Sequence, residues 1–265
     1  MLYSQPFLDR LPLWVLFVAT VLLFVSAVEV GFRIGRFGLA GRGEEAQKTQ
    51  VAPIMGASLG LLAFFLAFTF NMAGSRFDAR KKVVLEEANV VETAYLRSQL
   101  LPEPHRTEFQ DLLRKYVDVR VQVRSANIET IQHVVTKSEE LHGLLWSRLA
   151  TFLEKSPPSA VTGLFVRSLN DIVDLHRKRV TVGVYNRIPV AIFFTVYVVA
   201  LLSMGMMGYH AGLAGKRSFI ANLLLITAFA AVLLLITDLD RPGQKLFGVS
   251  QQTMVDLQSR INRTP

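Results

Sequence analysis

Cysteine is absent from the chain of 265 residues. This absence excludes disulfide bonds, thiolate nucleophiles and metal sites ligated by cysteine. Charge is also scarce, because only 19% of the residues are charged whereas 51% are hydrophobic. The apolar residues are concentrated in long blocks, and this distribution indicates a membrane protein rather than a soluble domain with a large core.

Signatures of enzymes and metalloproteins are also missing. The sequence has no glycine loop of the kind that cradles phosphate and no paired-histidine zinc motif. The nearest approach to a metal pair, Glu139 with His142, is more typical of a packed or solvated histidine. We therefore predict no enzyme activity, no catalytic residue, no metal site and no cofactor.

The net charge of +8 raises the question of a nucleic-acid partner. No basic recognition helix or aromatic–basic sheet motif accompanies this charge. Membrane proteins gather Lys and Arg near the cytoplasmic ends of their helices, which explains the excess. We therefore expect the lipid bilayer, and no nucleic acid, as the partner of the basic residues.

Four apolar blocks are long enough to cross a membrane, which takes roughly 20 residues. They run over about residues 11–30, 51–71, 188–209 and 218–237. A cleaved signal peptide is the alternative for the first block, but its long apolar core and the following Arg33 and Arg36 favour an uncleaved anchor. The sequence predicts an all-α integral membrane protein, in which two pairs of transmembrane helices flank a helical cytoplasmic bundle.

The predicted domains follow these blocks. Residues 1–72 hold the first pair of spans, 73–187 the helical cytoplasmic domain, 188–237 the second pair and 238–265 a cytoplasmic C-terminal tail. With four spans, both termini and the helical domain lie on one side of the membrane. Near the membrane that side carries eleven Lys and Arg, against six in the two short loops. This excess favours the cytoplasm for the first side, and the reversed orientation is the alternative.

The second block continues into the helical domain without a helix breaker. From Ala73 to Leu101 there is one glycine and no proline, so we expect one helix of about 50 residues, or about 70 Å. Farther along, apolar residues recur at helical spacing and predict an antiparallel bundle. These stripes are Phe109, Leu112, Leu113, Tyr116 and Val117; Leu141, Leu144, Leu145, Leu149 and Phe152; and Leu164, Phe165, Leu169, Ile172, Val173 and His176.

Two strips of side chains distinguish the second block from the others. Small residues at Gly56, Gly60, Ala63 and Ala67 allow the close approach of another helix, either within one subunit or between subunits. A second strip carries Phe64, Phe68 and Met72 at spacings of four. Around a symmetry axis such residues form a hydrophobic constriction of a pore, although ordinary packing also explains an apolar stripe.

Charged residues lie near the ends of the first two spans. Glu29 precedes Arg33 by one helical turn, so the two form either an ion pair that marks the helix end or a charged vestibule for ions. Arg76, Asp78 and Arg80 follow the second span. They belong either to a solvated, ion-paired helix face or to a cytoplasmic ion pathway.

The second block and its extension resemble the bacterial bestrophin-like domain family, a group of four-span membrane proteins. The resemblance covers about residues 53–104 and rests on Leu61-Leu62-Ala63-Phe64-Phe65-Leu66-Ala67-Phe68-Thr69-Phe70, Arg76-Phe77-Asp78-Ala79-Arg80, Glu86-Glu87-Ala88-Asn89, Thr93-Ala94-Tyr95-Leu96-Arg97 and Leu101-Pro102. It implies a relation to bestrophins, which are pentameric anion channels whose neck is formed by apolar residues of the second span. By position, Phe64, Phe68 and Met72 match that neck. An acidic calcium clasp after the fourth span is missing, so calcium gating is not expected.

Two hypotheses about function follow. The first is a homo-oligomeric protein of the bacterial inner membrane that passes inorganic anions through a pore lined by the second span. The second is a membrane-anchored helical scaffold or signalling protein that conducts no ions. In both cases the N-terminus, the central domain and the C-terminus are expected in the cytoplasm.

Overall fold

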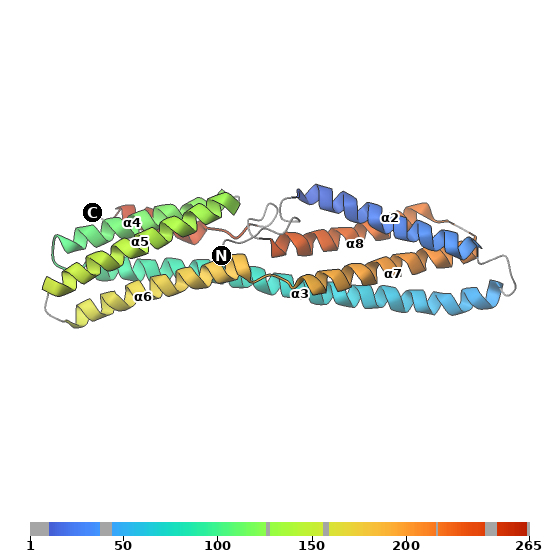
Figure 1. Cartoon of the computed structure of the whole chain (residues 1–265), viewed down its shortest axis with the longest axis horizontal. Coiled ribbons are helices and arrows are strands. Elements are labelled where there is room, and N and C mark those ends of the chain that lie inside the picture. The colour runs from blue at the N-terminus through green and yellow to red at the C-terminus, as the bar shows by residue number, and fades with distance from the viewer. Residues whose placement is uncertain are drawn as a thin grey trace. The chain divides into compact units, whose positions relative to one another are not determined.

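The computed structural model describes residues 11–37, 44–125, 128–155, 159–215, 217–241 and 248–263, and these residues contain helices but no strand. The helices are α2 (Leu13–Phe37), α3 (Glu44–Ser98), α4 (His105–Val121), α5 (Ile128–Lys155), α6 (Ala160–Val180), α7 (Val190–Ala214), α8 (Phe219–Asp240) and α9 (Gln252–Arg263), and Figure 1 labels α2 to α8. A short 3₁₀ helix, Gln122–Ser125, follows α4, and a π-helical turn, Thr181–Tyr185, follows α6. The all-α prediction is confirmed.

The chain divides into two compact units. Unit 1 comprises Met1–Ser75 and Ile188–Arg241, and unit 2 comprises Arg76–Arg187 and Pro242–Pro265. Helix α3 contributes residues to both units, and its 55 residues make the single long helix predicted from the sequence.

Four helical stretches are long and apolar enough to span a membrane: Leu13–Phe37, Thr49–Ser98, Ala160–Ala214 and Phe219–Asp240. They contain the four apolar blocks found in the sequence, and all four blocks belong to unit 1. The third stretch includes α6 and the π-helical turn as well as α7, and only its α7 part is a predicted span. The prediction of four transmembrane helices is therefore confirmed.

Glycines bring the backbones of α2 and α7 into direct contact. A Cβ atom built on Gly35 would lie 3.2 Å from the Cα of Gly212, and one built on Gly208 would lie 2.9 Å from the Cα of Val28. Small residues permit such close packing between helices in a membrane, where van der Waals contact drives association. These glycines were not predicted from the sequence, because their spacing does not reveal which two helices lie together.

A polar contact joins the same two helices closer to their other ends. The hydroxyls of Thr20 on α2 and Tyr197 on α7 are 3.1 Å apart and form a hydrogen bond. Thr20 is buried, so the bond satisfies a polar group that would otherwise lie unpaired inside the membrane.

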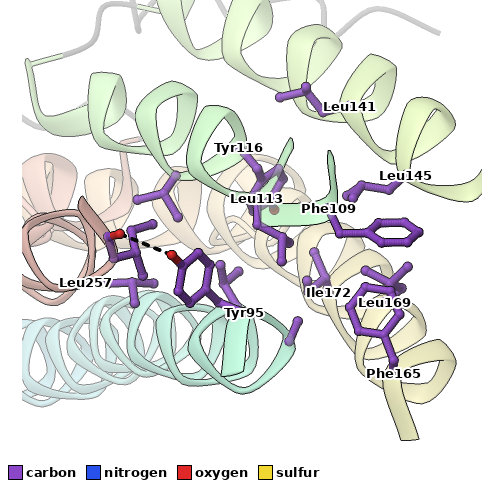
Figure 2. Close-up of a cluster of buried hydrophobic side chains, with 14 of the residues drawn as sticks. Tyr95, Phe109, Leu113, Tyr116, Leu141, Leu145, Phe165, Leu169, Ile172 and Leu257 are labelled. Carbon is purple, nitrogen blue, oxygen red and sulfur yellow. Dashed lines mark hydrogen bonds between the residues drawn. The ribbon is translucent and has the colours of Figure 1, made fainter. Parts of the chain in front are cut away.

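The core of unit 2 is a helical bundle in which α3, α4, α5 and α6 meet, as Figure 2 shows. The predicted α4 stripe is confirmed, because Phe109, Leu113, Tyr116 and Val117 are fully buried and Leu112 is partly buried. Two members of the other stripes, Leu144 on α5 and Leu164 on α6, were wrongly expected in the core. Both are exposed because they lie on the flanks of their helices, beyond the buried stripe.

Helix α9 completes this core, although the sequence predicts only a tail for residues 238–265. Its side chains Met254, Leu257 and Ile261 are buried in the cluster. The hydroxyl of Tyr95 donates a hydrogen bond to the carbonyl oxygen of Ile261 at 3.3 Å (Figure 2). At the surface, Arg260 donates two hydrogen bonds of 3.0 Å to the carboxylate of Glu92 on α3.

We predict that Gly208→Ala destabilises unit 1 whereas Gly205→Ala does not. The added methyl group at position 208 would overlap the backbone of Val28, but a Cβ at position 205 would lie 3.8 Å from the nearest atom, the Ala27 carbonyl oxygen. Overpacking of this kind costs about 1–3 kcal/mol. Thermal unfolding in detergent, followed by circular dichroism, measures both variants. Equal stability of the two variants would contradict the close packing of α2 and α7.

Candidate functional site

In unit 1, one face of α3 is packed and is called here the inner face. Its buried residues are Val51, Leu62, Leu66, Thr69 and Ala73, and the last four follow one another at spacings of three and four. The hydroxyl of Ser203 on α7 donates a 3.0 Å hydrogen bond to the carbonyl oxygen of Ser58, which lies on the same face. These contacts fix the rotation of α3 about its own axis.

The opposite side of α3, called here the outer face, carries two of the three predicted constriction residues. Phe64 is 65% exposed and Phe68 is 54% exposed in the single chain. Met72, the third, is half-buried and lies at the flank of this face. The structure thus brings Phe64 and Phe68 together on an open surface and places Met72 beside it.

The small residues of α3 are open as well. Gly56, Gly60, Ala63 and Ala67 are all exposed, and a Cβ atom built on either glycine would have no neighbour within 4 Å. Helix α3 therefore does not use this strip to pack against the rest of the described chain. The strip lies on the flank of the outer face, next to Phe64 and Phe68.

The segment Gly56-Ala57-Ser58-Leu59-Gly60 has the Gly-x-Ser-x-Gly spacing of hydrolase nucleophiles. Those nucleophiles stand on a sharp turn between a strand and a helix, with the hydroxyl exposed. Here the segment lies inside α3, and the Ser58 hydroxyl donates a 2.9 Å hydrogen bond to the carbonyl oxygen of Ile54. The local structure does not fit a nucleophile.

Glu29, near the end of α2, makes the predicted ion pair and a second one. Its carboxylate accepts a 2.9 Å hydrogen bond from Nε of Arg33. It also pairs with Arg217, which follows α7 in the chain and stacks 3.9 Å from the ring centroid of Phe32. Sequence spacing revealed the Arg33 pair, but the Arg217 contact depends on how α2 meets the segment between α7 and α8.

Arg76, Asp78 and Arg80 do not form one surface. Asp78 is exposed on the same side of α3 as Lys82, whereas Arg80 is buried and Arg76 is half-buried. Lys82 lies 4.0 Å from the carboxylate of Glu86, as the ion-paired helix face predicts. Of the three candidates, only Asp78 is placed where ions in solvent could reach it fully.

The most extensive polar arrangement lies in unit 2, outside the membrane-spanning segments. The carboxylate of Glu87 is fully buried and pairs with Arg179 of α6 and Arg120 of α4, the latter at 2.9 Å. The hydroxyl of Tyr116 donates to it at 2.6 Å. Arg179 also donates a 2.7 Å hydrogen bond to Gln251, just before α9. One carboxylate thus ties α3 to α4 and α6.

The guanidinium groups keep Glu87 ionised. Burial by itself would raise the pKa of the Glu87 carboxyl, but attraction to Arg179 and Arg120 outweighs it and lowers the pKa to about 2. The same burial, together with the Glu87 charge, raises the pKa of Tyr116 well above its usual value, so Tyr116 keeps the proton that it donates. Glu87 was not among the predicted site residues and entered the prediction only as part of the motif Glu86-Glu87-Ala88-Asn89. The sequence did contain a signal for a buried carboxylate, because Glu87 lies on the same helix face as the apolar residues Val84 and Val91.

Two buried histidines lie against this cluster. The rings of His142 on α5 and His176 on α6 are 4.9 Å apart, and Nε2 of His176 lies 3.9 Å from the carboxylate of Glu139. Burial, and then repulsion from Arg120, lowers the pKa of His142 to about 4 and that of His176 to about 3. Both imidazoles are therefore neutral at pH 7. Within the described residues, no group of three or more His, Asp or Glu side chains is arranged to hold a metal ion.

The four transmembrane helices, with a helical bundle inserted between the two pairs, define an all-helical multi-pass membrane protein. The chain belongs to the bestrophin-like domain family, whose model matches residues 14–254. No curated protein matches the chain in sequence.

Crystal structures of a bacterial bestrophin homolog from Klebsiella pneumoniae have the same fold. One variant with a single substitution has a TM-score of 0.66 at 13% identity, over 94% of this chain and 97% of that chain. A second variant has a TM-score of 0.65 at 14% identity over the same shares. A further structure of that homolog has a TM-score of 0.63 at 12% identity, over 94% of this chain and 99% of that chain.

We predict that Glu87→Gln destabilises unit 2 by about 3–5 kcal/mol, because it leaves two buried guanidinium groups without their counter-charge. Glu92→Gln is the matched control. It removes a carboxylate from the same helix, but the Glu92–Arg260 pair lies at the surface and contributes at most about 1 kcal/mol. Denaturant unfolding of the two variants measures the difference. A cost for Glu87→Gln no larger than that of the control would contradict a stabilising role for the cluster.

We also predict that acid weakens unit 2 through His142. Its pKa is about 4 in the folded chain and about 6.5 when unfolded, so the unfolded state binds more protons in between. Stability is therefore retained above pH 6.5 and falls as the pH drops towards 4, by on the order of 3 kcal/mol for complete titration. Unfolding measured from pH 7.5 to 4 should show a flatter profile for His142→Gln. His133→Gln, on the exposed face of the same helix, should leave the profile unchanged.

Proposed function

We propose that the chain assembles into a ring in the bacterial inner membrane and conducts inorganic anions, with the outer face of α3 turned towards the ring axis. The observation that carries this proposal is the open surface of α3, where Phe64 and Phe68 stand exposed on a helix whose other face is packed. A ring of such side chains forms a hydrophobic constriction, which is one way to gate a pore.

The small-residue strip supports an assembly of several copies. Gly56 and Gly60 offer a surface without side chains, so the backbone of a neighbouring helix can approach closely. Because the strip flanks Phe64 and Phe68, a neighbour that packs on it leaves the two phenylalanines facing the axis. The bestrophins to which the family name refers are pentameric anion channels, which agrees with this arrangement.

The distribution of Lys and Arg supports two parts of the proposal: the permeating ion is an anion, and unit 2 lies on the cytoplasmic side of the membrane. Eleven Lys and Arg lie near the membrane on the side of the termini and the helical domain, against six in the short loops. Lys81 and Lys82, both exposed on α3 beyond the span, raise the local concentration of anions.

A membrane-anchored helical scaffold or signalling protein is the second candidate function. Unit 2 favours it in one respect, because two leucines of its water-facing surface are exposed: Leu96, near the end of α3, is 55% exposed, and Leu100, in the turn that follows α3, is 63% exposed. Apolar side chains that gather on a water-facing surface often mark the site of a protein partner.

Oligomeric state and conductance decide between the two functions. We expect the protein in detergent to have the mass of a ring of several subunits by light scattering, and wild-type protein in planar bilayers to conduct anions. Phe68→Ala should raise the conductance severalfold, because it widens the constriction. Phe194→Ala is the matched control, since Phe194 is also an exposed phenylalanine but lies on α7. A monomer or dimer, or bilayers without conductance, would contradict the pore and leave the scaffold.

A further inference from the structure

The outer face of α3 changes from apolar to polar at Asn71. This residue follows Phe68 by three positions and Phe64 by seven, so it lies on the same side of the helix. Asn71 is exposed, and its side chain makes no hydrogen bond within the part of the chain that the structure describes. An amide group is thus presented on the open surface without a partner.

Several other polar side chains near or within the spans bond to the backbone of their own helices. Ser58 donates to the carbonyl oxygen of Ile54 at 2.9 Å, and Thr69 donates to that of Phe65 at 2.7 Å. On α2, exposed Ser26 likewise donates to the carbonyl oxygen of Leu22 at 2.8 Å. Asn71 differs from these residues, because lipid tails offer nothing to its amide and an unpaired amide in hydrocarbon is costly.

The position of Asn71 along the helix argues against a purely solvated helix end. The next residues on the outer face are Ser75 and then Asp78, the first charged one. Asp78 follows Asn71 by seven positions, so the amide lies about 10 Å along the helix from the first charge on its face. Along this surface, apolar side chains are therefore followed by neutral side chains that can form hydrogen bonds, and then by a charged side chain.

A carboxamide suits a partly dehydrated anion. Its NH₂ group offers two donors, which can replace water around the ion, and it carries no charge that would hold the ion too tightly. Amides from several copies around one axis would present a ring of donors directly beyond the apolar constriction.

We infer that Asn71 contacts the permeating ion, a small inorganic monovalent anion, and sets the preference of the pore for anions over cations. This inference rests on the proposed function and deepens it by assigning selectivity to one side chain. Phe64 and Phe68 set the width of the pore, and Asn71 sets which ion enters it.

Reversal potentials in planar bilayers under a chloride gradient test the inference. Asn71→Asp should lower the permeability ratio of chloride to sodium by about tenfold, because a ring of carboxylates repels anions and attracts cations. Asn222→Asp is the matched control, since it makes the same change on α8 and should leave the ratio unaltered. Asn71→Ser keeps a smaller donor, so it should preserve the anion preference but change the ratio of thiocyanate to chloride.

The outcomes separate this inference from the proposed function. Wild-type protein without conductance overturns the proposed function, and the inference with it. If the protein conducts but its permeability ratios are the same in wild type, Asn71→Asp and Asn71→Ser, the inference alone is overturned, because Asn71 then lies outside the ion path. Loss of the ring in both variants by light scattering also overturns it, because the amide then joins neighbouring subunits instead of contacting the ion.

Discussion

Within the described residues of unit 1, helix α3 is packed along one face, the inner face. Leu62, Leu66 and Thr69 are buried on that face, and the Ser203 hydroxyl bonds to the Ser58 carbonyl oxygen. Because a helix satisfies its backbone groups internally, its other face needs no protein partner for the chain to fold in a membrane. The packed face therefore fixes the orientation of α3, and this orientation determines which side chains the outer face presents.

Two other interactions hold the parts around α3 in place, one in each unit. In unit 1, backbone contact at Gly35 and Gly208 joins α2 to α7, so that α7 is anchored where it meets α3. In unit 2, the Glu87 carboxylate binds guanidinium groups of Arg120 and Arg179 from two other helices. A buried charge is costly when it is unpaired, so this cluster permits only arrangements in which all three helices meet.

The sequence predicted what depends on local pattern. Apolar runs located the four spans, and the lack of proline after Ala73 predicted the long helix, because both properties act over adjacent residues. Contacts between distant segments were not predictable in this way. Arg179 follows Glu87 by 92 residues, and α9 docks on α3 from the end of the chain. Phe64 and Phe68 were found by spacing, but only the packed face of α3 shows that they lie on an open surface.

The open surface of α3 differs from the surfaces that the other spans expose. Trp14, Leu22 and Leu23 on α2, and Phe219, Ile220 and Leu224 on α8, are large apolar side chains of the kind that lipid tails surround. A lipid-facing helix gains nothing from exposed glycines, and an unpaired amide is a cost to it. Helix α3 exposes Gly56, Gly60 and Asn71 together. The glycines suit contact with protein and the amide suits contact with water or an ion, so this surface is the part of unit 1 where lipid is the least suitable neighbour.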